Sequence, residues 1–237
     1  MHMNIHDIRH IFTEKFINKE FVTDKTGVKT IEILASDFIA DEPFIFGKPN
    51  QDYIERELTW YNSQSLNVND IPPPVPVIWQ KVATPDGRIN SNYGWAIYSE
   101  ENFNQYKSCF AELSRNPDSR RAVMLYTRPS MQVEYNKDGM SDFMCTFTTH
   151  HLIRDNKLQT IMMMRSNDAL RGYNNDFAWI DHVHKKLADD LKIETGNIYW
   201  KANSLHVYET HFYLVDHYSR TGEVYISKKD YDAIYNN

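Results

Sequence analysis

Two β-rich segments, FMCTFTTHHLI at residues 143–153 and LQTIMMM at residues 158–164, decide the fold. Only RDNK at residues 154–157 separates them, and a short polar connection between two such runs predicts a β-hairpin. Next along the chain, NND at residues 174–176 precedes a predicted helix. The apolar line of that helix consists of Phe177, Ile180, Val183, Leu187 and Leu191. This order predicts a sheet covered by helices.

The flanking sequence extends the same pattern. An amphipathic helix is predicted at the start of the chain, and the proline-rich run IPPPVP at residues 71–76 is predicted to be a surface connection. Further strands are predicted at residues 29–40, 121–127 and 197–208, and further helices at residues 52–64, 101–113 and 211–218. Without strict alternation of strand and helix, this mixture favours an α+β arrangement around one sheet. No repeat, linker or break in composition divides residues 1–237, so we expect a single domain.

Composition excludes several classes of protein. The 237 residues are 41% hydrophobic and 14% aromatic, as in a folded globular protein. The net charge of −6 provides no general attraction for nucleic acid, so we expect no direct nucleic-acid partner. No apolar run is long enough to span a membrane, and we expect no membrane partner. With Cys109 and Cys145 alone, a disulfide framework is excluded, which favours a reducing, cytoplasmic location.

Two residues stand out for their chemistry. Cys145 lies within a segment that is predicted to be a strand, where a cysteine is either a small buried residue or a nucleophile. Glu57 lies three or four residues from apolar positions on both sides, which places a carboxylate on the apolar face of a helix. Burial would raise its pKa towards the range for proton transfer, but Glu57 could instead lie at the edge of the face and reach solvent or an arginine.

The arginines and histidines give weaker indications of a phosphate-binding or metal-binding site. Arg120 and Arg121 are adjacent, and Arg165 precedes Ser166; guanidinium and hydroxyl groups suit a phosphate, although most arginine pairs form surface ion pairs. None of the ten histidines shows the spacing of a metal site, and we predict no metal.

Ordered motifs over most of the chain carry a resemblance to a known family. They are DKTGVKTIEI, DEPFIFG, YIERELTWY, IWQKVA, INSNYGWAIYSE, NPDSRRAVMLYTRPSMQ, YNKDGMSDFMCT, MRSNDALRGYNNDFAW, SLHVYETHFYLVDH and TGEVYISKKDY. Together they resemble the thymidylate synthase superfamily and, within it, the bacteriophage deoxycytidylate hydroxymethylases. The resemblance implies a large mixed β-sheet flanked by helices, a homodimer formed sheet to sheet with shared active sites, and 5,10-methylenetetrahydrofolate as the carbon donor.

The resemblance also implies roles for individual residues. Cys145 matches the nucleophile that adds to carbon 6 of the pyrimidine, and Glu57 matches the glutamate that moves protons at the base. The residues implied to bind the nucleotide are Arg165 and Ser166, Arg120 and Arg121 from the other subunit, His206 and Tyr208, and Lys25, which replaces the family's arginine. Strand geometry places His206 and Tyr208 on one face. The residues implied to bind folate are Asp168, Trp79 and Tyr93.

Asp176 decides the predicted substrate. Thymidylate synthases carry an asparagine eleven residues after the arginine of their Arg-Ser-x-Asp motif, whereas Asp176 stands eleven residues after Arg165. An amide both donates and accepts, which suits uracil; a carboxylate only accepts, which suits the amino group of cytosine and a protonated nitrogen 3. Asp176 therefore favours dCMP. In two other interpretations Asp176 caps the following helix, or a shift of one residue places Asn175 in this position.

The sequence departs from thymidylate synthases in three places, and the last of them favours hydration over methylation. Thr146 follows the nucleophile in place of a histidine, Lys25 replaces an arginine, and DYDAIYNN ends the chain without the family's apolar closure. A site less sealed against water would hydrate an exocyclic methylene rather than reduce it. The predicted enzyme is a dCMP hydroxymethylase. The alternatives are a hydroxymethylase or synthase acting on dUMP, and an inactive nucleotide-binding scaffold.

Overall fold

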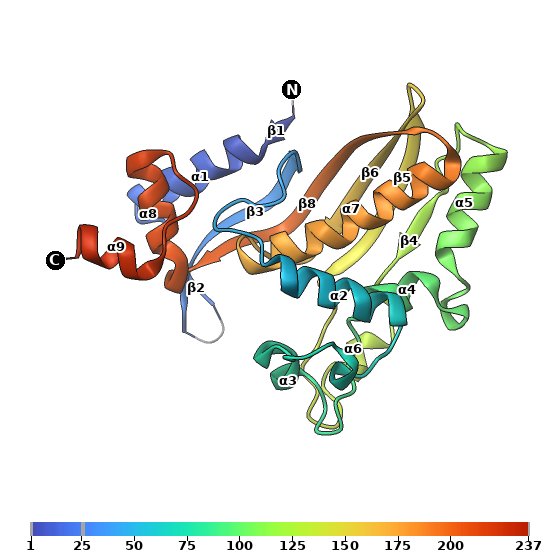
Figure 1. The fold of residues 1–237 in the computed structure, drawn as a ribbon, viewed down its shortest axis with the longest axis horizontal. Helices are drawn as coiled ribbons and strands as arrows, with labels where there is room; N and C mark the ends of the chain where they lie inside the picture. Colours follow the sequence, from blue (N-terminus) through green and yellow to red (C-terminus); the bar gives the residue numbers. More distant parts are fainter. Residues whose placement is uncertain (1, 25–26, 237) are drawn as a thin grey trace. The chain divides into compact units, whose positions relative to one another are not determined.

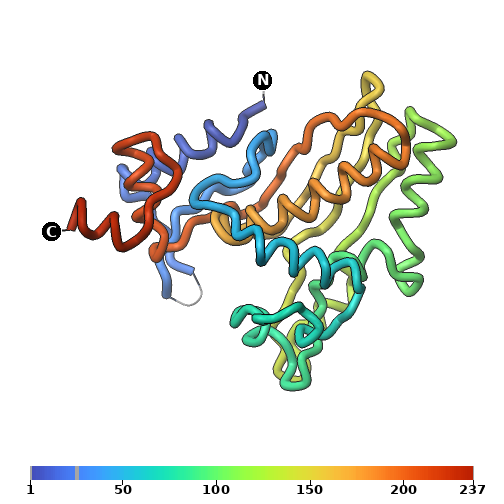
Figure 2. The backbone as a smooth tube through the Cα atoms, viewed as in Figure 1, coloured from blue at the N-terminus to red at the C-terminus, as the bar shows by residue number. Residues whose placement is uncertain are grey.

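A computed structural model describes residues 2–24 and 27–236 (Figures 1 and 2). The chain forms two compact units. Unit 1 comprises Met1–Pro49, Met164–Asp181 and Asn197–Asn237, and unit 2 comprises Asn50–Met163 and His182–Gly196. Because segments of the two units alternate along the chain, they are not successive domains, and the single catalytic domain stays a prediction.

The strands of unit 1 form a mixed sheet. Strand β3 (Lys29–Ile39) confirms the strand predicted at 29–40, and β8 (Glu194–Tyr208), which enters from unit 2, runs antiparallel to it. Strand β1 (Met3–Asn4) pairs parallel and β2 (Val22–Thr23) antiparallel with β3, while β7 (Asn167–Asp168) pairs parallel with β8. The predicted mixed sheet with flanking helices is confirmed.

Helix α1 (Ile5–Ile17) confirms the amphipathic helix predicted at the start of the chain. A capping box between Asn4 and Asp7 begins it, and it buries apolar residues against β3 and α8 (Phe212–Thr221). Helix α8 confirms the helix predicted at 211–218, although it begins one residue later, after the short η3 (Glu209–His211). Helix α9 (Lys228–Tyr235), which the sequence did not indicate, packs against α8.

The predicted hairpin is the centre of unit 2. Strands β5 (Thr146–Arg154) and β6 (Lys157–Met164) flank Asp155 and Asn156, whose φ angles of 52° and 57° are left-handed. Two such residues form the two-residue turn that matches the twist of a hairpin. Strand β4 (Val123–Leu125) pairs antiparallel with β5 and is shorter than the predicted 121–127. The prediction that Cys145 lies inside the strand was wrong, because Cys145 lies in a bend immediately before β5.

Helices surround these strands in unit 2. They are α2 (Gln51–Ser63), η1 (Val68–Asp70), α3 (Val77–Val82), α4 (Tyr93–Tyr98), η2 (Glu100–Asn102), α5 (Gln105–Arg115) and α6 (Met131–Glu134). Residues 71–76 connect η1 to α3, as predicted. The helix predicted at 101–113 was wrong at its start, because Phe103 and Asn104 have left-handed φ angles of 61° and 40°. Asn104 then caps α5 by accepting a bond from the Lys107 amide.

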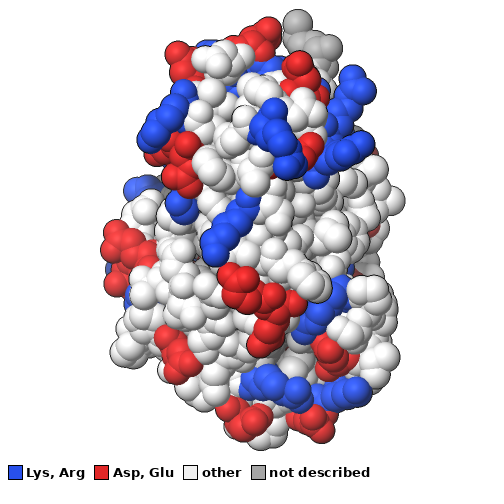
Figure 3. Space-filling model, turned by 90° about the vertical axis from the view of Figure 1, so that its right-hand side faces the viewer, with Lys and Arg blue, Asp and Glu red and all other residues white. Residues whose placement is uncertain are grey.

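Helix α7 (Arg171–Leu191) begins in unit 1 and ends in unit 2. The prediction that residues 174–176 precede this helix was wrong, since they lie inside it. The reason is a cap that sequence reasoning missed: Asp168 Oδ1 accepts bonds from the Leu170 and Arg171 amides at 2.8 and 3.4 Å. Across residues 2–24 and 27–236, none of the helices has the length and apolar character needed to cross a membrane. The face drawn in Figure 3 carries acidic and basic side chains interspersed.

Candidate active site

The predicted site residues form two groups, one in each unit. Unit 2 holds Glu57, Trp79, Tyr93, Arg120, Arg121 and Cys145, and unit 1 holds Arg165, Ser166, Asp168, Asp176, His206 and Tyr208. Lys25 lies outside the described residues.

Glu57 is a buried carboxyl on α2. Its exposed fraction is 4%, and its partner is a tyrosine one helical turn earlier: the Tyr53 hydroxyl donates to Glu57 Oε1 at 2.5 Å. The Tyr53 oxygen in turn accepts a bond from Trp79 Nε1 on α3 at 2.7 Å. The alternative that Glu57 reaches solvent or an arginine from the edge of the face was therefore wrong.

Burial gives Glu57 the electrostatics of a proton carrier. Loss of hydration raises the pKa of Glu57 from 4.5 to about 7, and hydrogen bonds from Tyr53, Trp79 and Tyr61 act in the opposite direction. Near neutral pH both protonation states of Glu57 are therefore populated, so this side chain can accept or release a proton at little cost.

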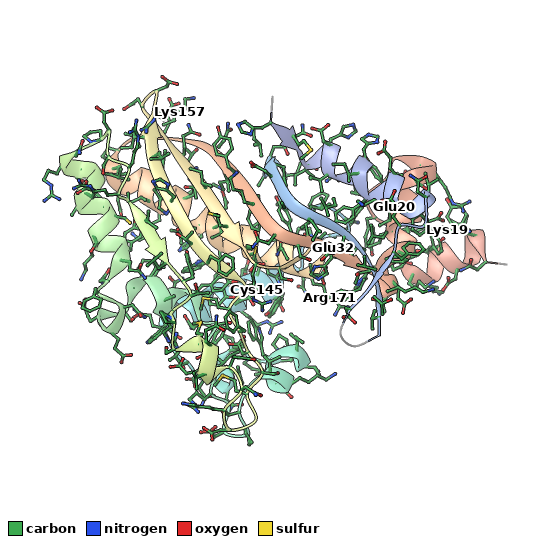
Figure 4. All side chains as sticks on the ribbon, turned by 180° about the vertical axis from the view of Figure 1, so that it is seen from behind. Lys19, Glu20, Glu32, Cys145, Lys157 and Arg171 are labelled. Atoms are coloured by element: carbon green, nitrogen blue, oxygen red, sulfur yellow. The ribbon has the colours of Figure 1, made fainter. Side chains whose placement is uncertain are left out.

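Cys145 lies at the start of β5, where Figure 4 labels it. The segment before it is anchored by the buried Asp142, whose carboxylate accepts bonds from the Asn90 amide at 2.8 Å and the Ser91 hydroxyl at 2.7 Å. After it, the Thr146 hydroxyl bonds to the Tyr93 hydroxyl at 3.0 Å. Cys145 is half-buried and is thus held on both sides without being enclosed in the core.

Cys109 contrasts with Cys145. It lies on α5 with an exposed fraction of 3%, and burial raises the pKa of its thiol to about 12. A thiol that stays protonated is a poor nucleophile. Cys109 is therefore a buried structural residue.

The two aromatic residues predicted to line the folate site differ in exposure. Trp79 is half-buried beside Trp60, with ring centroids 5.4 Å apart, whereas Tyr93 is only 4% exposed and stacks on Tyr61 at 5.1 Å. Trp79 therefore has ring surface to offer a ligand, and Tyr93 mainly supports its neighbours.

Arg120 and Arg121 are exposed immediately before β4. Within residues 2–24 and 27–236, neither guanidinium forms a hydrogen bond or ion pair. Arg121 acts on Glu112 only through its charge, which helps to lower the pKa of that carboxyl after the larger effects of Ser119 and Arg115.

In unit 1, Asp176 points from α7 towards β7. Its Oδ2 accepts a bond from Asn167 Nδ2 at 2.8 Å. Gly172 makes this approach possible, since a Cβ there would lie 3.1 Å from Asn167 Nδ2 and 3.6 Å from Asp176 Oδ2. The interpretation of Asp176 as a helix cap was wrong, because α7 begins at Arg171 and Asp168 caps it.

The other predicted site residues of unit 1 lie at or just after the ends of β6, β7 and β8. Arg165 and Ser166 are half-buried after β6, and Asp168 pairs in register with His206. The rings of His206 and Tyr208 are 4.9 Å apart, which confirms that they share a face of β8. Ser204 precedes them on that face and donates to Glu32 of β3, a residue also labelled in Figure 4.

The sequence of this chain is similar to those of known proteins. The thymidylate synthase family profile matches residues 8–224. The chain belongs to the thymidylate synthase family. Two curated relatives, from Enterobacteria phages T4 and T2, are named deoxycytidylate 5-hydroxymethyltransferase; each is 57% identical over 98% of this chain, covering 98% and 97% of the relative. A thymidylate synthase of Francisella philomiragia is 27% identical over 67% of this chain and 61% of its own length.

Sequence reasoning missed three residues that contact the predicted site residues or support the segment before Cys145. Tyr53 and Asn167 hold the carboxylates of Glu57 and Asp176. Arg128 donates from Nη2 to Asn90 Oδ1 at 2.9 Å and lies over the Trp95 ring at 4.9 Å. The sequence offered one signal for Arg128, a third arginine soon after Arg120 and Arg121, and only the Arg-Ser-x-Asp motif could have drawn attention to Asn167.

A further feature of Arg128 is its unsatisfied nitrogen. Nη1 is buried without a hydrogen-bond partner among the residues described, although Nη2 also binds Glu134 at 2.7 Å. Through Asn90, which bonds to Asp142, Arg128 supports the segment that carries Cys145. Over the same residues, no group of three or more histidine, cysteine or acidic side chains is placed to bind a metal.

Proposed function

We propose that this protein is a deoxycytidylate 5-hydroxymethyltransferase. It transfers a one-carbon unit from 5,10-methylenetetrahydrofolate to carbon 5 of dCMP and adds water, giving 5-hydroxymethyl-dCMP and tetrahydrofolate. The relatives that bear this name match the chain over almost its full length. This activity makes the protein a transferase that modifies a DNA precursor rather than DNA.

The observation that carries the choice of substrate is the Asp176 carboxylate held by Asn167. A carboxylate fixed by an amide N–H presents acceptors to the base, and dCMP offers an amino group and, when protonated, nitrogen 3 as donors. The uracil of dUMP would present a carbonyl oxygen to this carboxylate, leaving two buried acceptors facing each other. Protonation of nitrogen 3 also makes carbon 6 a better electrophile.

The reaction begins when the Cys145 thiolate forms a bond to carbon 6, which makes carbon 5 nucleophilic. Folate supplies the carbon unit that carbon 5 takes up. Loss of the carbon 5 proton and departure of tetrahydrofolate leave an exocyclic methylene on the pyrimidine. Water adds its oxygen to this methylene, the ring takes up the electrons, and expulsion of the Cys145 sulfur restores the 5,6 double bond.

Glu57 serves these proton transfers. A carboxyl with a pKa of about 7 can hold a proton for the base and can also orient and deprotonate water. Because Glu57 is buried beside Tyr53 and Tyr61, its charge is not screened by bulk water, and small changes in its contacts alter its proton affinity.

The folate partner is supported by the surface around Trp79. Helix α3 exposes Val77 and Ile78 at 63% and 62% beside the half-buried indole, and a flat aromatic ligand would cover such an apolar patch. Asp168 would accept bonds from the pterin, and Tyr93 would support the site from behind through its bond to Thr146.

For the nucleotide phosphate we propose Arg165 and Ser166, with Arg120 and Arg121 reaching in from a second copy of the chain. The exposed guanidinium groups of Arg120 and Arg121, which form no hydrogen bond or ion pair with the described residues, support this homodimer. Apolar side chains exposed on strands support a partner that covers them: Leu125 at 58% and Met163 at 40% in unit 2, and Leu34 at 71% in unit 1. Lys25 would complete the phosphate site, His206 and Tyr208 would bind the deoxyribose hydroxyl, and the cytoplasm would supply both substrates.

Incubation with dCMP and 5,10-methylenetetrahydrofolate tests the proposal. The expected products are 5-hydroxymethyl-dCMP and tetrahydrofolate, separated by chromatography. Dihydrofolate with a methylated nucleotide would instead identify a synthase, and turnover of dUMP but not dCMP would contradict the role of Asp176. Cys145→Ser should abolish turnover while nucleotide binding persists, and Cys109→Ser is the matched control that should retain activity.

A further inference from the structure

Tyr53 connects two residues of the proposed site that are far apart in sequence. It precedes Glu57 by four residues on α2, so both side chains lie on one face of the helix. Its hydroxyl donates to Glu57 Oε1 at 2.5 Å and accepts from Trp79 Nε1 at 2.7 Å. The Tyr53 hydroxyl thus both donates a hydrogen bond and accepts one.

The direction of these bonds is determined by chemistry. An indole N–H can only donate, so the Tyr53 oxygen must accept from Trp79, and its single proton is left to point at Glu57. Burial, together with the charge of Glu57, raises the pKa of Tyr53 far above its ordinary value. Tyr53 therefore keeps its proton at every working pH and acts as a permanent donor.

The Trp79 side of this chain of bonds is anchored to the same helix. Arg56 on α2 donates to the Pro72 carbonyl at 3.1 Å and the Pro74 carbonyl at 2.6 Å, which ties the segment before α3 to α2. The Trp79 ring also packs against Trp60 of α2. The indole is thus held where its N–H meets Tyr53.

We propose that Tyr53 is a positioning residue that orients the Glu57 carboxyl and links its proton affinity to the placement of Trp79. The proposal rests on the proposed function, in which Glu57 moves protons and Trp79 lies on the folate side. Donation from Trp79 polarises the Tyr53 hydroxyl and strengthens its bond to ionised Glu57. A ligand that draws the indole away from Tyr53 would weaken this bond and favour protonated Glu57.

The groups that act on this chain of bonds come from two elements. Helix α2 contributes the titratable Tyr53 and Tyr61 and the charge of Arg56, and α3 contributes the N–H of Trp79. Tyr53 bonds to both Glu57 and Trp79, and Trp79 also lowers the pKa of Glu57 as a hydrogen-bond donor of its own, so the relay is the part of the Trp79 effect that requires Tyr53.

Infrared titration of the protonated Glu57 carbonyl, identified by its loss in Glu57→Gln, tests the relay without substrate. In Tyr53→Phe the midpoint should rise by about one pH unit, the size expected for loss of one hydrogen bond to a charged group. Trp79→Phe should raise it less, and in the Tyr53→Phe background it should raise it by less than in the unaltered protein, because only the bond from Trp79 to Glu57 itself is then left to lose. Tyr106→Phe is the matched control, since its hydroxyl donates to Asp190 at 2.6 Å elsewhere in unit 2, and should leave the midpoint unchanged.

An unchanged midpoint in Tyr53→Phe, or additive effects of the two substitutions, would overturn the relay. If Tyr53→Phe does not fold, Trp79→Phe alone decides, and an unchanged midpoint in that variant overturns it as well. The pH profile of kcat should shift with the infrared midpoint in each active variant. Absence of any product from dCMP in the unaltered protein would instead count against the proposed function, while the infrared result still decides the relay.

Discussion

Replacing Glu57 with glutamine should make the stability of this protein less dependent on pH. The pKa of Glu57 is raised from 4.5 to about 7 in the folded protein. Between these two values the folded protein retains a proton that the unfolded chain has released, so the free energy of unfolding falls as pH rises and levels off above about 7. Glutamine keeps the shape of the neutral acid and does not titrate.

The magnitude follows from the difference between the two pKa values. At 1.36 kcal/mol per unit, the rise from 4.5 to about 7 corresponds to about 3 kcal/mol of stability lost between pH 4.5 and 8. Glu57 is 4% exposed, so solvent screening does not reduce this value greatly. For a chain of this size, that is roughly 6 to 12 °C in Tm.

Urea unfolding at pH 5, 6, 7 and 8, followed by circular dichroism at one chain concentration, measures the effect. The difference between Glu57→Gln and the unaltered protein isolates this carboxyl, because the other titrating groups cancel. It should grow in favour of the variant as pH rises. Glu55→Gln, on an exposed position of the same helix, should show a constant difference. A Glu57→Gln difference that stays constant from pH 5 to 8 would refute the assignment of a raised pKa.

Three further substitutions test the two groups of predicted site residues. Asp176→Asn should shift the ratio of kcat/KM from dCMP towards dUMP by about 10² to 10⁴, measured by steady-state kinetics with both nucleotides; an unchanged ratio would remove Asp176 as the base-reading residue. Asn167→Ala removes the donor to Asp176 and should lower kcat/KM for dCMP by about tenfold with little change in the urea midpoint; an equal loss with dUMP would show a general defect. Asp142→Ala leaves the Asn90 amide and the Ser91 hydroxyl unpaired and should cost about 3 kcal/mol in urea unfolding, with faster alkylation of Cys145 by iodoacetamide; unchanged values of both would show that Asp142 does not anchor this segment.

Local sequence patterns were sufficient to predict the features that depend on residues close together in the chain. Asp155 and Asn156 tolerate left-handed backbone, and the hairpin formed where they predicted it. The spacing of apolar residues around Glu57 indicated its burial, because a helix places residues three and four apart on one face. Boundaries were less predictable: the start of α7 depends on Asp168, which belongs to the preceding strand β7.

By itself, the sequence determined the mixed sheet with flanking helices, the family and the residues that we propose carry the chemistry, since these follow from periodicity and from motifs read in order. Only the tertiary structure decided which partners hold those residues. Tyr53 lies 26 positions from Trp79, and Asn167 lies nine from Asp176 across a turn. A hydrogen bond needs two atoms within about 3 Å, and the meeting of separate elements sets that distance rather than the residue types alone.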